Sequence, residues 1–217
     1  MNRANWLASA GLVYVVAWVV GLLIEFNSPG PSASTADLTA YFLTHQQAHM
    51  LQSYLIDGIA GVAMLVFAAS VAGVFQKFGD ESVTLSRIVF GAGVAAASVS
   101  VVQAGMQQVL SNHDVLVTGD APIRTMLVLI SETDTFKLLV LALLSGAASF
   151  LILRTRALPQ WLGWLGVVLS LTLIFGGLSF VLNSPALSNV LVVSLPLLLL
   201  WVGGISVVIL RRVEAAT

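Results

Sequence analysis

The sequence predicts an all-α polytopic membrane helix bundle with six transmembrane helices and with both termini in the cytoplasm. Composition is the first observation: of 217 residues, 58% are hydrophobic and only 9% are charged, whereas a soluble domain carries roughly 25% charged residues. The second is that several apolar runs are long enough to cross a bilayer, which takes about 20 residues as a helix. A helix is favoured there because it satisfies its own backbone hydrogen bonds in hydrocarbon.

The third observation is the alternation of apolar runs with turn formers, which makes residues 1–217 one membrane domain of six spans. The predicted spans cover residues 6–24, 54–75, 88–110, 137–153, 161–182 and 190–210. Proline, glycine or asparagine interrupts the chain between the first two spans and at both ends of the fifth. The first apolar run exceeds the about 7–15 residues of a signal-peptide core, so we expect it to remain as a span.

Basic residues in the loops predict the orientation. With a cytoplasmic N-terminus, seven basic residues fall inside: Arg3, Lys77, Arg87, Arg154, Arg156, Arg211 and Arg212. Only Arg124 and Lys137 fall outside. Because cytoplasmic loops carry the excess of lysine and arginine, we expect a multi-pass protein of the bacterial inner (plasma) membrane, with the lipid bilayer as its first partner.

The same composition excludes several function classes. The net charge is −1 and no basic stripe is present, so nucleic acid, which is bound through its phosphates, is not an expected partner. The chain has no cysteine, which excludes disulfides, thiolate catalysis and cysteine-based metal sites.

Two spans are expected to extend beyond the bilayer on the outer side. Residues 25–53 form an outer loop and an amphipathic extension of the second span; Ser34 and Asp37 resemble a capping box, and no proline follows before Phe78. The sequence therefore predicts a helix that runs continuously into the membrane. Residues 111–136 form the equivalent loop and extension of the fourth span. Here residues 131–134, Ser-Glu-Thr-Asp, resemble a second cap, which leaves open whether the extension and the span are one helix or two.

Polar groups from three spans reach the same depth at the outer boundary. At about 100° per residue, histidines and amides of the second span share one helix stripe, and a neighbouring stripe ends in an aspartate. The sequence thus predicts an outward-facing polar pocket that binds a small molecule, an ion or a partner. Its predicted ligand-binding residues are His45, His49, Gln52, Asp57, Gln103, Gln107, Glu132, Asp134 and Lys137.

Asp57 lies about one turn inside the second predicted span, and Lys137 begins the fourth. A charge within a span costs about 2.5–3.5 kcal/mol on insertion scales, so it normally has a partner or a cavity. We therefore expect a salt bridge between the two side chains or a cavity that both line. The alternative is that each extends separately to the membrane interface.

A metal site is a second interpretation of the histidines. His45 and His49 have the i,i+4 spacing of helical metal ligands, and His113 with a carboxylate such as Glu132 would complete the shell. Gln46 stands where a zinc-protease motif has glutamate. The favoured interpretation is therefore structural, with histidines hydrogen-bonded or solvated; proton sensing is the remaining one, because histidine titrates near neutral pH.

One element carries a family resemblance. Before and within the fifth span, Pro159, Trp161, Leu162, Leu165 and Gly166 form a Pro-x-Trp-Leu-x-x-Leu-Gly pattern. With it, the chain resembles uncharacterised bacterial six-helix integral membrane proteins grouped as a domain of unknown function. The resemblance implies the fold and topology given above and assigns no catalytic residue.

The function expected from the sequence is binding rather than catalysis, as a transporter-like protein, a sensor or an accessory subunit. The alternative is a metal- or haem-dependent membrane enzyme or redox protein that uses His45, His49 and His113. A structural subunit whose outer polar face contacts another protein is a third. The sequence leaves the oligomeric state open.

Overall fold

The computed structural model describes residues 3–25, 29, 33–116, 120–182 and 185–214. Within these ranges the chain is helical and contains no strand, which confirms the all-α prediction. In chain order the elements are α1 (Arg3–Ile24), α2 (Thr35–Thr44), α3 (Gln46–Ser53), the π-helix η1 (Tyr54–Ile59), α4 (Ala60–Phe75), α5 (Asp80–Leu110), α6 (His113–Leu116), α7 (Asp120–Thr155), α8 (Gln160–Leu182) and α9 (Pro185–Glu214).

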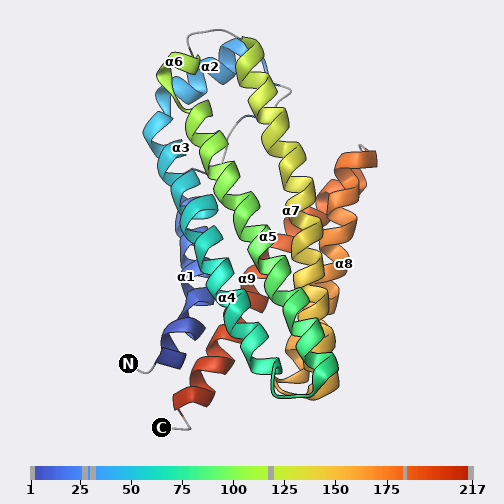
Figure 1. The fold of residues 1–217 in the computed structure, drawn as a ribbon. Coiled ribbons are helices and arrows are strands. Elements are labelled where there is room, and N and C mark those ends of the chain that lie inside the picture. Colours follow the sequence, from blue (N-terminus) through green and yellow to red (C-terminus); the bar gives the residue numbers. More distant parts are fainter. Residues whose placement is uncertain (1–2, 26–28, 30–32, 117–119, 183–184, 215–217) are drawn as a thin grey trace.

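The long helices pack side by side (Figure 1), and their contacts close into a ring. Around the ring, α1 packs on α4, α4 on α5, α5 on α7, α7 on α8, α8 on α9, and α9 returns to α1. The start of α1 and the end of α9 lie at one end of the ring, which we call the terminal end. The short helices α2 and α6 lie across the opposite end, the cap end.

Five helical segments are long and apolar enough to cross a membrane. They are Gln46–Phe75, Asp80–Leu110, Pro122–Thr155, Gln160–Ser179 and Asn189–Arg212. The first predicted span corresponds to α1, whose described apolar part, Ser9–Ile24, is shorter than these five. The molecule is therefore a helical bundle of the multi-pass membrane class.

The second predicted span differs from expectation at its outer end. Ser34 does cap α2, because its Oγ accepts the N–H of Asp37 at 3.2 Å. The helix is interrupted at His45, with φ −107° and ψ 16°, and resumes as α3, η1 and α4. The interruption lets α2 turn across the bundle and bury Leu38 and Phe42, whereas α3 follows the direction of the span.

The fourth predicted span and its extension are one helix. α7 continues without interruption from the cap end to the terminal end, so the possible second cap near Ser131 does not start a new helix. Its first turns join a small apolar cluster at the cap end. The cluster consists of Leu38, Phe42, Leu110, Leu116, Ile123 and Ile130.

The main core lies toward the terminal end, where small residues allow close approach. A side chain at Gly93 would overlap the Cβ of Ala68, and one at Gly166 would overlap Ser149 and Trp201. Trp201 is fully buried and donates its indole N–H to the carbonyl of Leu162 at 3.1 Å. Small residues at helix interfaces are the usual means of tight packing in membranes.

Candidate functional site

A buried ion pair lies between the second and fourth predicted spans. Lys137 Nζ is 2.9 Å from Asp57 Oδ1, and the two side chains are only 11% and 10% exposed. The predicted pairing is therefore confirmed. The alternative, in which each side chain extends separately to the membrane interface, is wrong. Burial makes the pairing important, because a single charge left in an apolar span is unfavourable.

Gln103 extends the ion pair into a four-residue network. Its amide oxygen accepts a second hydrogen bond from Lys137 Nζ at 2.8 Å, and its amide nitrogen donates to Asp134 Oδ1, also at 2.8 Å. The side chains thus alternate as Asp57, Lys137, Gln103 and Asp134 across η1, α5 and α7. Fully paired polar networks of this kind fix the relative positions of the helices that supply them.

The π-helix η1 holds Asp57. The backbone N–H of Ala60 donates to the carbonyl of Leu55, five residues earlier, in place of the four-residue spacing of an α-helix. π-Helical turns within α-helices are rare and frequently occur at functional sites. The irregular turn and the buried aspartate therefore coincide at the same point of the bundle.

A second polar group joins α1, α2, α3 and α5 at the cap end. His49 Nδ1 is 3.2 Å from Glu25 Oε2, and His49 Nε2 is 2.7 Å from Gln107 Oε1. Tyr41 donates its hydroxyl to the other oxygen of Glu25, and Gln52 donates to the backbone carbonyls of Gly21 and Glu25. Burial, and next the hydrogen bond to Glu25, raise the pKa of Tyr41 above its ordinary value.

Between the two groups lies a cavity of about 270 Å³, which we call the polar cavity. Eight of its lining residues are polar: Glu25, Gln52, Ser53, Asp57, Gln103, Gln107, Asp134 and Lys137. Trp18, Leu22 and Ile56 complete the lining. In their ordinary ionised forms the lining residues carry three carboxylates and one ammonium group.

The polar cavity brings together six of the nine predicted ligand-binding residues: Gln52, Asp57, Gln103, Gln107, Asp134 and Lys137. His49 lies behind the lining, because its two ring nitrogens contact Glu25 and Gln107. His45 and Glu132 are exposed and do not line the cavity. The ring of His45 stacks on Tyr41, with ring centroids 4.6 Å apart.

Three residues of the site, Glu25, Tyr41 and Trp18, were not among those predicted from the sequence. Glu25 follows the first apolar run directly and was placed on the outer side, which was the available signal for it. Tyr41 precedes His45 by four residues, so the two share a helix face, but nothing in the sequence pairs it with Glu25. Trp18 also lines the cavity from within α1, and the apolar sequence around it does not mark it as a site residue.

Among the described residues, no three histidine, aspartate or glutamate side chains lie close enough together to hold a metal ion. His45 and His49 contact different partners, as given above. The side chain of His113 lies outside the described residues. Ligation of a metal or haem by His45, His49 and His113 therefore stays a prediction.

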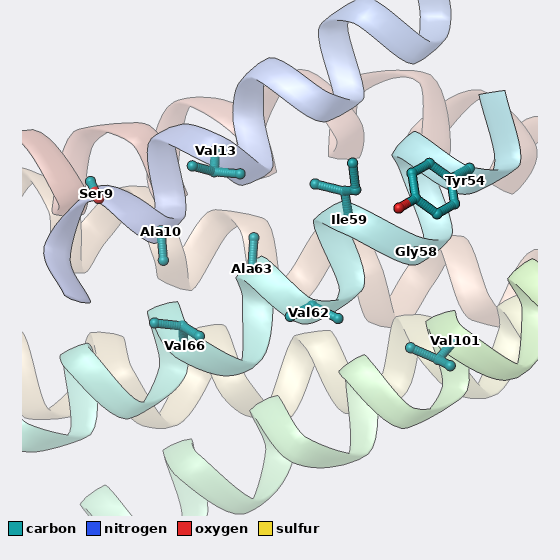
Figure 2. Close-up of a pocket in the computed structure, with 10 residues that line it drawn as sticks. All are labelled: Ser9, Ala10, Val13, Tyr54, Gly58, Ile59, Val62, Ala63, Val66 and Val101. Atoms are coloured by element: carbon teal, nitrogen blue, oxygen red, sulfur yellow. The ribbon is translucent and has the colours of Figure 1, made fainter. Parts of the chain in front are cut away.

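An apolar groove of about 550 Å³ lies on the other side of η1. Figure 2 shows Val13 of α1 facing Val62 and Ala63 of α4, with Tyr54 and Gly58 of η1 at one end. Val13, Tyr54 and Val62 are each about half exposed, so we call this the lipid-facing groove. It carries no charged group, and η1 thus separates a charged cavity from an apolar surface.

Fold and site together define a class: a multi-pass membrane helix bundle with a buried charged network near one end. No family model matches the chain, and neither a curated protein nor a solved structure does. The chemistry of the polar cavity is therefore the basis for a functional proposal.

Proposed function

We propose that this protein binds a small cation in the polar cavity, from the outer side of the membrane, as a sensor, a transporter-like protein or an accessory subunit. The observation that supports the proposal is the lining of the cavity. Three carboxylates, on Glu25, Asp57 and Asp134, face one ammonium group, on Lys137. Lys137 is paired with Asp57 at 2.9 Å and Glu25 contacts His49 at 3.2 Å, so among the described residues Asp134 is the lining carboxylate whose hydrogen-bond partner is an amide rather than a basic side chain.

Geometry supports the same proposal. The polar lining residues are held by hydrogen bonds to other helices, so their positions are set before a ligand binds. Gln103 is bonded to Lys137 and Asp134, and Gln52 is bonded to the end of α1. A site organised in advance loses less conformational freedom on binding. Its remaining acceptor oxygens suit a donor such as an ammonium group.

The test is direct binding of ethylammonium, measured by calorimetry on the purified full chain in lipid nanodiscs. Asp134→Asn keeps the size and the hydrogen bond of this side chain but removes its charge. We expect roughly 10- to 100-fold weaker binding, since hydrogen bonds to charged groups contribute about 1.5–3 kcal/mol.

Glu132→Gln is the matched control. It removes one negative charge from the same helix, two residues away, at an exposed position outside the cavity. Binding should be nearly unchanged. Equal losses in both variants, or equal binding of ethylammonium and propionate by the wild type, would show that the cavity does not select cations.

The same proposal includes the topology and the membrane. It takes α1 as a sixth span, places both termini in the cytoplasm of a bacterium, and makes the chain a member of the six-helix family that it resembles. The orientation is supported by the basic residues. Lys77, Arg154 and Arg211 lie near the terminal end, as expected for a cytoplasmic side.

The absence of cysteine allows a clean topology test. Ala36→Cys at the cap end and Lys77→Cys at the terminal end are both at exposed positions. A membrane-impermeant maleimide added to intact cells should label only the Ala36→Cys variant. Labelling of Lys77→Cys alone would reverse the orientation, and the polar cavity would then face the cytoplasm.

A further inference from the structure

A second, smaller cavity adjoins the polar cavity deeper in the bundle. It has a volume of about 140 Å³ and lies between α1, α7, α8 and α9; we call it the apolar cavity. The two cavities share three lining residues, Trp18, Asp134 and Lys137. A molecule that occupies both would therefore pass these three side chains.

The apolar cavity has a different chemistry. Apart from the shared residues, it is lined mostly by leucines of α7, α8 and α9, with Tyr14 and Ser194. Ser194 donates its hydroxyl to the carbonyl of Val190 in its own helix at 3.0 Å, which leaves it little capacity to attract a polar group. The cavity therefore favours an apolar occupant.

Its size limits that occupant. An apolar cavity of roughly 150 Å³ is known to hold benzene, so about 140 Å³ suits one six-membered ring or a short branched chain. The cavity is too small to enclose a full lipid acyl chain. Trp18 stands at the junction of the cavities, and the face of an indole ring attracts cations.

We infer that the polar and apolar cavities together form one site for a small amphiphilic amine. The ammonium group lies in the polar cavity near Asp134 and Glu25, and a ring-sized apolar group enters the apolar cavity past Trp18. This inference rests on the proposed cation binding and adds the class of ligand. An ammonium ion with one compact apolar substituent satisfies both chemistries at once.

The test compares three probes with the full chain in nanodiscs, with empty nanodiscs subtracted. The probes are ethylammonium, 2-phenylethylammonium and neutral 2-phenylethanol. Burial of a phenyl ring is worth about 1.5–3 kcal/mol, so 2-phenylethylammonium should bind roughly 10- to 100-fold more tightly than ethylammonium. The alcohol should bind more weakly than the ring-bearing amine, because it lacks the charge.

Ser194→Leu locates the ring. The variant fills the apolar cavity and should remove most of the advantage of 2-phenylethylammonium over ethylammonium. Val193→Leu, at the neighbouring position, which is 53% exposed on the outside of α9, is the matched control and should change neither. Leu195→Phe fills the same cavity from a partly exposed position and replaces Ser194→Leu if that variant does not fold.

The outcomes separate the two proposals. If ethylammonium and 2-phenylethylammonium bind equally, or if filling the apolar cavity changes nothing, cation binding stands and the amphiphilic ligand is refuted. Binding of neither amine refutes both. If phosphatidylethanolamine added to the nanodiscs displaces the amine, the ammonium group belongs to a lipid, and the free ligand is refuted.

Discussion

The two ends of the helix ring are built by different means. Toward the terminal end, helices approach closely at glycines such as Gly93, and the ion pair of Glu81 with Arg154 is 63% and 50% exposed. Near the cap end, helices are joined by a buried pair, Asp57 with Lys137, and its amide partners. Close glycine contacts occur toward both ends of the ring. What distinguishes the cap end is buried polar pairing around a cavity.

The largest expected effect comes from breaking the buried pair. Asp57→Leu leaves the ammonium of Lys137 buried without its partner at 2.9 Å. Removing one member of a buried pair costs about 3–5 kcal/mol, so we expect a decrease of that order in the free energy of unfolding in detergent. Exchanging the charges, with Asp57→Lys and Lys137→Asp together, should recover part of the loss. A double variant no more stable than either single one would argue against pairing as the stabilising contact.

The next largest effect tests close packing toward the terminal end. Gly93→Ala places a methyl group against the Cβ of Ala68, and such overpacking costs about 1–3 kcal/mol. Gly91→Ala, two residues earlier on the same helix, is the control, because a methyl group there would meet nothing within 4 Å. Since alanine is a better helix former than glycine, this variant should leave the thermal unfolding temperature unchanged or higher. Equal behaviour of the two variants would mean that the helices are not in close contact there.

A smaller effect is expected from the hydrogen bond between Tyr41 and Glu25. Tyr41→Phe should lower the free energy of unfolding by about 1 kcal/mol. Since the folded-state pKa of Tyr41 is raised above the unfolded value of about 10, the contribution is complete below pH 10 and is lost as pH rises toward the folded value. The difference in unfolding temperature between wild type and variant should therefore shrink only above about pH 10.

Tyrosinate absorbance supplies the independent check on Tyr41. The tyrosine signal that the Tyr41→Phe variant lacks should be one that, in the wild type, ionises at a higher pH than an exposed tyrosine does. Loss of an early-titrating phenol would show that Tyr41 is neither buried nor bonded to Glu25.

The smallest effect is expected at the exposed ion pair of the terminal end. Arg154→Met removes the partner of Glu81, but exposed pairs contribute little because water screens them. The thermal unfolding temperature should stay within experimental error of the wild type. A decrease as large as that of Gly93→Ala would contradict the view that close packing, rather than this exposed ion pair, stabilises the terminal end.

Much of the fold follows from the sequence, because apolar run length and turn formers act locally. The pairing of Asp57 with Lys137 was also predictable, since two opposite charges inside spans at equal depth each need a partner. Depth, however, says nothing about rotation around a helix axis. Glu132 was expected in the pocket and is exposed, whereas Asp134, two residues further along the same helix, lines the cavity.

The irregular turns were beyond the sequence for a different reason. The interruption at His45 depends on Leu38 and Phe42 packing against the ends of α5 and α7, which are distant in the chain. The π-helix η1 has no proline to cause it, and it lies where Asp57 pairs with Lys137 of a distant helix. Such features depend on tertiary structure rather than on local propensity.

The π-helix also preserves the rotational phase between the two parts of one membrane helix. A regular α-helix turns by about 100° per residue, so one residue added to a regular helix would rotate α3 relative to α4 by that angle. The wider turn of η1 absorbs the added residue, because its hydrogen bond spans five residues rather than four. Deleting one residue from Tyr54–Ile59 should therefore restore a regular turn and leave His49 facing Glu25. The turn thus carries one additional residue without changing how the cap end is aligned with the core.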